Sequence, residues 1–226
     1  MGPCDFVCEV VASYQRAQRP AYPYCGLFRS HNRPIGHEVE DLLARYLIDK
    51  LPRGTAIYIN PKVTIEPGAS WRPDLVVVRD EKLRAFIEVK TDLGFVRSQF
   101  SSLWDQRYNQ VSGVRAGAKT LSFMAESFGD KEMHVHVARD AWLMYVVISG
   151  TNINAAGLRN IQRMKEGKER SDLFILTEDR HPNARNEREK LKIRYNDFSR
   201  MVAELKRAVS AGHSATDQEQ RASDEA

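Results

Sequence analysis

Two acids and one lysine stand at a spacing that suits metal-dependent chemistry. Asp74 follows Pro73, and Glu88 and Lys90 come later in the sequence Glu-Val-Lys. Hard cations such as Mg²⁺ take carboxylate oxygens as ligands, commonly one or two of them together with waters and substrate phosphate. An ammonium group beside such a cation can orient or deprotonate a water and stabilise negative charge on phosphorus. The three residues therefore suit phosphate-ester hydrolysis, provided that they converge.

Convergence depends on a hairpin within residues 73–91, where two strand-like segments flank a charged turn. A three-residue turn at 80–82 would place Asp74 opposite Glu88, with Cβ atoms about 5 Å apart. Lys90 would project from the same face, because side chains alternate along a strand. Like charges directly opposite one another destabilise a sheet. We therefore expect a divalent cation to offset their repulsion.

A simpler interpretation is an exposed edge hairpin whose charges only keep it soluble. Most charged residues do lie on the solvent-facing side of a strand. The face shared by Asp74 and Glu88, however, also carries Val76, Val78 and Phe86. A surface that is apolar along most of its length favours a core-facing strand pair with a polar end.

The rest of the chain predicts elements that would surround this hairpin. Apolar residues at helical spacing predict a helix over 37–51, which Pro52 ends. The other expected elements are strands over 55–65, 73–79 and 83–91, a helix over 97–112, a buried strand over 142–149, a helix over 153–167, a strand over 172–178 and a helix over 196–210. This order predicts an α/β domain with a mixed central β-sheet flanked by helices.

We expect one domain over residues 36–210. Residues 1–35 contain several prolines and aromatic residues and predict an irregular N-terminal extension with one short helix near 5–17. Residues 211–226 are polar and rich in small side chains, which predicts a disordered tail.

Pro73-Asp74 followed by Glu88-Val89-Lys90 resembles the core motif of the PD-(D/E)XK nuclease superfamily, which includes many restriction endonucleases and Holliday-junction resolvases. By this resemblance, Asp74 and Glu88 would bind a metal ion. The main-chain carbonyl of Val89 would be a further ligand, and Lys90 would position the water. The metal would be Mg²⁺, with Mn²⁺ as a substitute.

The resemblance covers roughly residues 36–150. In this region the expected order of helix, three strands, helix and strand is similar to the αβββαβ core of the family. The resemblance implies a restriction-endonuclease-like fold and a metal-dependent hydrolysis of DNA.

Family members usually add an acid from the helix before the sheet. Glu40 lies on the buried stripe of the expected helix, with Leu43 and Leu47. Glu38 shares a side with Leu42 and remains an alternative. We prefer Glu40, which would support the metal directly or through water. Either acid also has a structural interpretation, because the helix dipole favours carboxylates in the first turn.

The helix after the third strand often presents a Gln or Tyr toward the site in this family. Gln106 and Gln110 are the candidates, with Tyr108 on another side of the helix. We name Gln106 as the catalytic candidate. A solvent-exposed or packing role is an equal alternative for each of these side chains.

The composition is that of a globular protein that could bind a polyanion. The chain has 226 residues, of which 42% are hydrophobic and 28% charged, and a formal net charge of +4. We expect part of the basic region 159–194 to contact phosphates, although acids interrupt it, and Arg97 is a further basic candidate. No Gly-rich phosphate loop occurs, so we do not expect nucleoside triphosphate hydrolysis.

Three cysteines do not predict a disulfide framework, and neither a signal peptide nor a membrane-spanning segment is recognisable, so we expect a cytoplasmic protein with no membrane partner. The resemblance to the nuclease superfamily implies a DNA endonuclease of the restriction, defence or repair type, and we expect a homodimer if it breaks both strands. A catalytically silent nucleic-acid-binding or protein-interaction module on the same fold is the alternative. RNA as the substrate also stays open.

Overall fold

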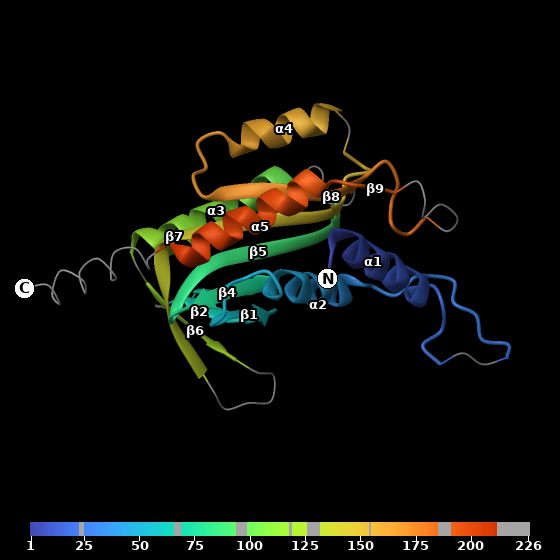
Figure 1. Ribbon diagram of the computed structural model, residues 1–226, viewed down its shortest axis with the longest axis horizontal. Coiled ribbons are helices and arrows are strands. Elements are labelled where there is room, and N and C mark those ends of the chain that lie inside the picture. The colour runs from blue at the N-terminus through green and yellow to red at the C-terminus, as the bar shows by residue number, and fades with distance from the viewer. Residues whose placement is uncertain are drawn as a thin grey trace, which may run out of the picture.

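The computed structural model describes residues 1–22, 25–65, 69–93, 99–117, 119–125, 132–153, 155–184 and 191–211. This part of the chain forms an α/β fold in which five helices pack on one open, mixed and mostly antiparallel sheet (Figure 1). The helices are α1 (Pro3–Ala17), α2 (Gly36–Ile48), α3 (Phe100–Ala116), α4 (Ala155–Lys165) and α5 (Tyr195–Ser210). The strands are β1 (Thr55–Ile59), β2 (Val63–Ile65), β3 (Ala69–Trp71), β4 (Leu75–Arg79), β5 (Lys82–Asp92), β6 (Thr120–Met124), β7 (Glu132–Ser149), β8 (Ser171–Glu178) and β9 (Lys192–Ile193).

The strand order is β1-β4-β5-β7-β6-β2-β3, and β8 and β9 continue the sheet from β7. Within the described ranges, the pairs β5–β7 and β7–β8 are parallel and the other pairs are antiparallel. The long strand β7 pairs with β6 from Glu132 to His136, with β5 from His136 onward, and with β8 from Leu143 to Ser149 (Figure 1). The sheet thus has a central region, β4-β5-β7-β8, that is covered on both sides.

Two hydrophobic cores lie on the two faces of this central region. Val77 and Ile87 belong to the core that includes residues of α1, α2 and α5. Val76 and Phe86 belong to the opposite core, which includes residues of α3 and α4. Because successive side chains alternate between the faces, β4 and β5 need apolar residues at nearly every position, and the sequence supplies them.

The helices expected over 37–51, 97–112, 153–167 and 196–210 are present as α2 to α5 with shifted ends, although positions 97 and 98 lie outside the described residues. The prediction of a single strand over 55–65 is wrong. Asn60 adopts a left-handed backbone conformation with φ 52°, and Pro61 follows it, so β1 and β2 are separate strands. The short strands β3 and β6 were not expected.

The structure also corrects the prediction that residues 1–35 form an irregular extension outside the domain. Phe6 and Val10 on α1 are fully buried. The Phe6 ring centroid lies 5.5 Å from that of Tyr46 on α2 and 5.7 Å from that of Phe198 on α5. The helix expected near 5–17 is therefore present, but it is part of the main core.

The tail expected over 211–226 lies outside the described residues except for Ala211. Among the helices of the described ranges, none has the length and apolar character that a membrane crossing requires.

Candidate active site at the open end of the β4–β5 hairpin

The expected hairpin is present, but its turn differs from the expected one. Asp80 and Glu81 have φ values of 51° and 57° and form a two-residue turn, since Arg79 pairs with Lys82. Positive φ at both central residues is the conformation of a type I′ turn. The prediction of a three-residue turn at 80–82 is therefore wrong.

A β-bulge restores the expected register beyond the turn. Arg84 has no partner in β4, because Val78 pairs with Leu83 and Val77 pairs with Ala85. The ladder then continues to its last pair, Leu75 with Ile87. The next positions on the two strands are Asp74 and Glu88, as the sequence predicted.

Asp74, Glu88 and Lys90 converge at this end of the hairpin. The Lys90 Nζ atom lies 3.4 Å from Asp74 Oδ2 and 3.3 Å from Glu88 Oε2. Asp74 Oδ2 also accepts a hydrogen bond of 2.6 Å from the backbone N–H of Val89. The ammonium group thus bridges the two carboxylates, at the position where a cation shared by both would lie.

Glu88 is held by two further side chains. Its Oε1 atom accepts a hydrogen bond of 3.2 Å from the indole N–H of Trp71 and lies 3.7 Å from Nε of Arg107 on α3. The Arg107 guanidinium also stacks over the Trp71 ring, 5.0 Å from its centroid. With only 6% of the residue exposed, Glu88 is a buried carboxylate whose two oxygens both face positive or donor groups.

Burial and the neighbouring charges shift the pKa values of the site residues in opposite directions. Burial raises the pKa of the Glu88 carboxyl, and the charge of Asp74 raises it further, while Lys90 and Arg107 act in the other direction. Burial alone would lower the pKa of Lys90, but the carboxylates of Asp74 and Glu88 outweigh it and the pKa is raised. Lys90 therefore stays a cation in the metal-free protein.

Glu40, and not Glu38, points toward this end of the hairpin. The Glu40 side chain is buried and accepts a hydrogen bond from the side-chain amide of Asn60. The backbone N–H of Asn60 in turn donates to the main-chain carbonyl of Asp74 at 2.8 Å. Glu38 instead pairs with Arg16 of α1 at 3.3 Å. Glu40 is thus linked to Asp74 through Asn60 and is not in direct contact with the triad.

The helix α3 reaches the site with Arg107, whereas the side chain of Gln106 is exposed. Gln110 accepts a hydrogen bond of 2.8 Å from Arg107 and so helps to hold it. The sequence did not single out Arg107 as a residue of this site. The available signal was its helical spacing, because Arg107 follows buried Trp104 by three residues and precedes buried Val111 by four.

The donor atoms fit a hard cation with a partly hydrated shell. Two carboxylates with waters are a common ligand set for Mg²⁺, and an ammonium already stands between the carboxylates of Asp74 and Glu88. Within the described ranges, no cluster of three or more His, Cys, Asp or Glu side chains could hold a metal. Asp74 and Glu88 alone would therefore supply the side-chain ligands, and the roles of the Val89 carbonyl and Glu40 stay predictions.

The basic region 159–194 is largely neutralised where the structure describes it. Lys168 pairs with Asp105 at 2.9 Å, and Arg194 pairs with Glu178 at 3.0 Å and with Asp197 at 2.7 Å. Arg97 and residues 185–190 lie outside the described residues. Phosphate contact by this region remains a prediction.

Comparison of the chain with protein family models, with curated proteins and with solved structures finds no match.

Proposed function

We propose that the protein is a divalent-metal-dependent phosphodiesterase that hydrolyses DNA, with a restriction-endonuclease-like core of the PD-(D/E)XK type. The observation that carries the proposal is the convergence of Asp74, Glu88 and Lys90 on one end of the hairpin. The order α2, β1, β4, β5, α3 and β7 supports it, because β1, β4 and β5 form an antiparallel meander and β7 joins β5 in parallel. This is the arrangement expected for an αβββαβ core, with β2, β3 and β6 as additions.

Each residue of the site then has a defined task. Asp74 and Glu88 would hold Mg²⁺ or Mn²⁺, which when bound activates a water and stabilises charge on the phosphate. The Val89 N–H orients Asp74, and Trp71 and Arg107 orient Glu88. The Lys90 ammonium donates hydrogen bonds to a water or to a non-bridging phosphate oxygen, where negative charge develops.

A second candidate is a catalytically silent binding module on the same fold. It is favoured by one observation, namely that Lys90 and Arg107 already compensate the two acids within the protein. The charges would then form a structural ion-pair network that requires no bound metal. Enzyme and binding module differ in what happens when single members of the network are removed.

The test is a cleavage assay on plasmid, linear, single-stranded and branched DNA in Mg²⁺, Mn²⁺ or EDTA. We expect metal-dependent cleavage by the wild type, and loss of cleavage with retained DNA binding in Asp74→Ala, because removing a negative charge does not weaken phosphate contacts. We expect Lys90→Ala to lower turnover by about 10²-fold, the scale of losing one electrostatic or acid–base group. Asn109→Ala, an exposed position on α3, is the matched control and should cleave as the wild type does.

Equal cleavage by the wild type, Asp74→Ala and Lys90→Ala would end the assignment of a nuclease site to these residues. Loss of DNA binding together with a lower melting temperature in Asp74→Ala would favour the structural network. An RNA substrate in the same assay decides between the two nucleic acids. A sedimentation measurement tests the homodimer that cleavage of both strands would require.

A further inference from the structure

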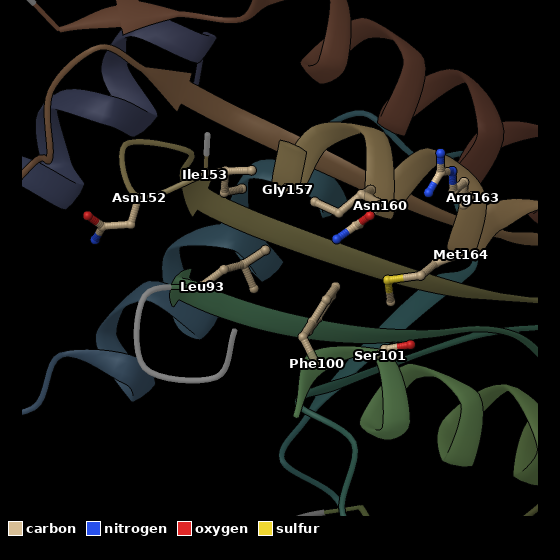
Figure 2. Close-up of a pocket in the computed structure, with 10 residues that line it drawn as sticks. Leu93, Phe100, Ser101, Asn152, Ile153, Gly157, Asn160, Arg163 and Met164 are labelled. Atoms are coloured by element: carbon tan, nitrogen blue, oxygen red, sulfur yellow. The ribbon is translucent and has the colours of Figure 1, made fainter. Parts of the chain in front are cut away.

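A cavity of about 490 Å³ opens at the carboxyl ends of the parallel strands β5 and β7, between α3 and α4 (Figure 2). Its walls come from the end of β5, the first turn of α3, the segment after β7 and one side of α4. In open α/β sheets, the carboxyl ends of parallel strands are where ligands bind. The position alone therefore suits a binding site.

The floor of the cavity is apolar and rigid. Leu93, Phe100 and Ile161 line it and are largely buried. The Phe100 ring is fixed by two neighbouring aromatic rings, with centroid distances of 5.7 Å to Trp104 and 5.3 Å to Tyr145. A flat apolar group that enters the cavity would meet a preformed surface and would not have to order it.

The rim is polar, and none of the described residues that line the cavity carries a carboxylate. Ser101, Asn160 and Arg163 are exposed residues among those that line the cavity. Figure 2 shows the Asn160 amide between α4 and Phe100, on the side facing α3. An Asn amide can donate to and accept from the edge of a base at the same time, and an Arg favours a phosphate group. The rim therefore matches an anionic ligand that has hydrogen-bonding edges.

The cavity is next to the proposed catalytic residues. Leu93 directly follows the last residue of β5 and comes three residues after Lys90, a distance of about 10 Å at the usual rise per residue of a strand. Leu93 and Phe100 belong to the same hydrophobic core as Trp71, the side chain that donates to Glu88. A DNA strand with one phosphate at Lys90 can thus place the base of a nearby nucleotide in the cavity.

We propose that this cavity binds one unstacked nucleobase of the DNA strand whose phosphate lies at Asp74, Glu88 and Lys90. The inference rests on the proposed function and names a base-binding subsite of the same active centre. The apolar floor covers the face of the base, and the Asn160 amide bonds to its edge. Because a base must leave its stack to enter, the site favours single-stranded or unpaired DNA over an intact duplex.

The test compares two labelled probes of equal length in EDTA, where no metal-dependent cleavage occurs. One is a single-stranded oligonucleotide, and the other is the same sugar-phosphate chain without bases. We expect the wild type to bind the first about tenfold more tightly, as one base contact contributes. Asn160→Phe fills the cavity and should abolish the preference, and Asn160→Ala should reduce it. Gln162→Ala removes an exposed amide from the same helix and should leave the preference unchanged.

Equal affinity of the wild type for the two probes, no binding of either, or a preference that survives in Asn160→Phe would each overturn the subsite. The nuclease proposal fails separately. A preference that Asn160→Phe removes, without any cleavage in Mg²⁺, retains the base site and rejects the nuclease. Cleavage in Mg²⁺ without a preference for the probe that carries bases retains the nuclease and rejects the base site.

Discussion

Glu88 is a carboxylate that the fold both buries and surrounds with positive charge. Burial is the larger effect and raises its pKa, so the folded protein binds the Glu88 proton more tightly than the unfolded chain does. The stability that this group contributes is full below the ordinary glutamate pKa. It is lost as the pH rises through the raised pKa of the folded state.

We therefore expect Glu88→Gln to change the pH dependence of stability. As the pH rises from the ordinary glutamate pKa through the raised pKa of folded Glu88, wild type loses the contribution of the Glu88 proton, and the variant has no such proton to lose. The melting temperature in EDTA should thus fall more, or rise less, in the wild type than in Glu88→Gln as the pH increases. Parallel curves for the two proteins would show that burial does not control this carboxyl.

Lys90 is the only side chain that contacts both acids of the triad in the described part of the chain. Lys90→Ala leaves two opposed carboxylates without their bridging cation. We expect a loss of about 2 kcal/mol in EDTA, which is less than for a fully buried ion pair because the Lys90 side chain is partly exposed. Added Mg²⁺ should raise the melting temperature of this variant more than that of the wild type, because the ammonium no longer competes for the site. Lys82→Ala, at an exposed position on the same strand, is the control. An equal Mg²⁺ response would contradict the shared position of ammonium and metal.

At the residue scale, the sequence predicted the triad and missed its supports. Asp74, Glu88 and Lys90 follow from the alternation of side chains along two neighbouring strands. Trp71 and Arg107 reach Glu88 from β3 and α3, and no local pattern specifies how a distant helix is placed over a sheet. Only the tertiary packing brings these side chains together.

At the scale of elements, the β4–β5 hairpin shows how a register can be predicted through the wrong turn. The sequence reasoning assumed one extra residue in the turn, and the structure has that residue as a bulge at Arg84. Both arrangements give the same pairing from Val77 to Leu75. The alternation of apolar side chains fixes the register there, because a slip of one residue would move Val76 and Phe86 out of their core.

The connection between β1 and β2 depends on Asn60, which has φ 52° and binds Glu40 through its side chain. Asn60→Gly keeps the backbone conformation and removes the side-chain contacts with Glu40 and His37, so we expect a loss of about 1 kcal/mol. Asn60→Ala removes the same two contacts and adds about 1 kcal/mol of left-handed strain. Urea unfolding of both variants measures the difference. Equal stability of the two would mean that the backbone relaxes and that the link to Asp74 does not depend on this conformation.

In the proposed nuclease, Arg107 would give α3 a role in the active site in addition to its packing role. We expect Arg107→Ala to weaken metal-dependent cleavage by about tenfold or more, since Glu88 loses its guanidinium partner and Trp71 loses its stacking partner. Arg107→Lys should recover only part of the activity, because an ammonium cannot stack and pair in the same plane. The Mg²⁺ concentration at half-maximal rate should rise in both variants. If Asn109→Ala, at an exposed position on α3, showed the same defect, the helix and not Arg107 would be the cause.

For the whole molecule, the division of the chain into domain and extension was the least accurate prediction. The prolines and aromatic residues of 1–35 suggested an irregular segment, yet α1 shares its core with α2 and α5. Phe6 and Val10 are apolar at helical spacing, but the same short pattern suits a peripheral helix equally well. What decides is the apolar surface that α2 and α5 leave to be covered, and that surface exists only in the folded protein.

A chain that begins at residue 36 should therefore fail to fold, although it contains every residue of the proposed active site. Within the intact chain, Phe6→Ala removes a fully buried ring and should cost about 3–5 kcal/mol of unfolding free energy. Cys8→Ala changes an exposed position on the same helix and should have an effect within about 0.5 kcal/mol. Urea unfolding monitored by circular dichroism measures both variants, and the truncated chain is examined for a cooperative transition. A cooperative transition in that chain, or equal stability of the two variants, would show that α1 is an accessory to a core that is complete without it. Loss of cleavage in Phe6→Ala at a temperature where it is still folded would instead indicate that α1 acts on the position of α2, and through Asn60 on Asp74.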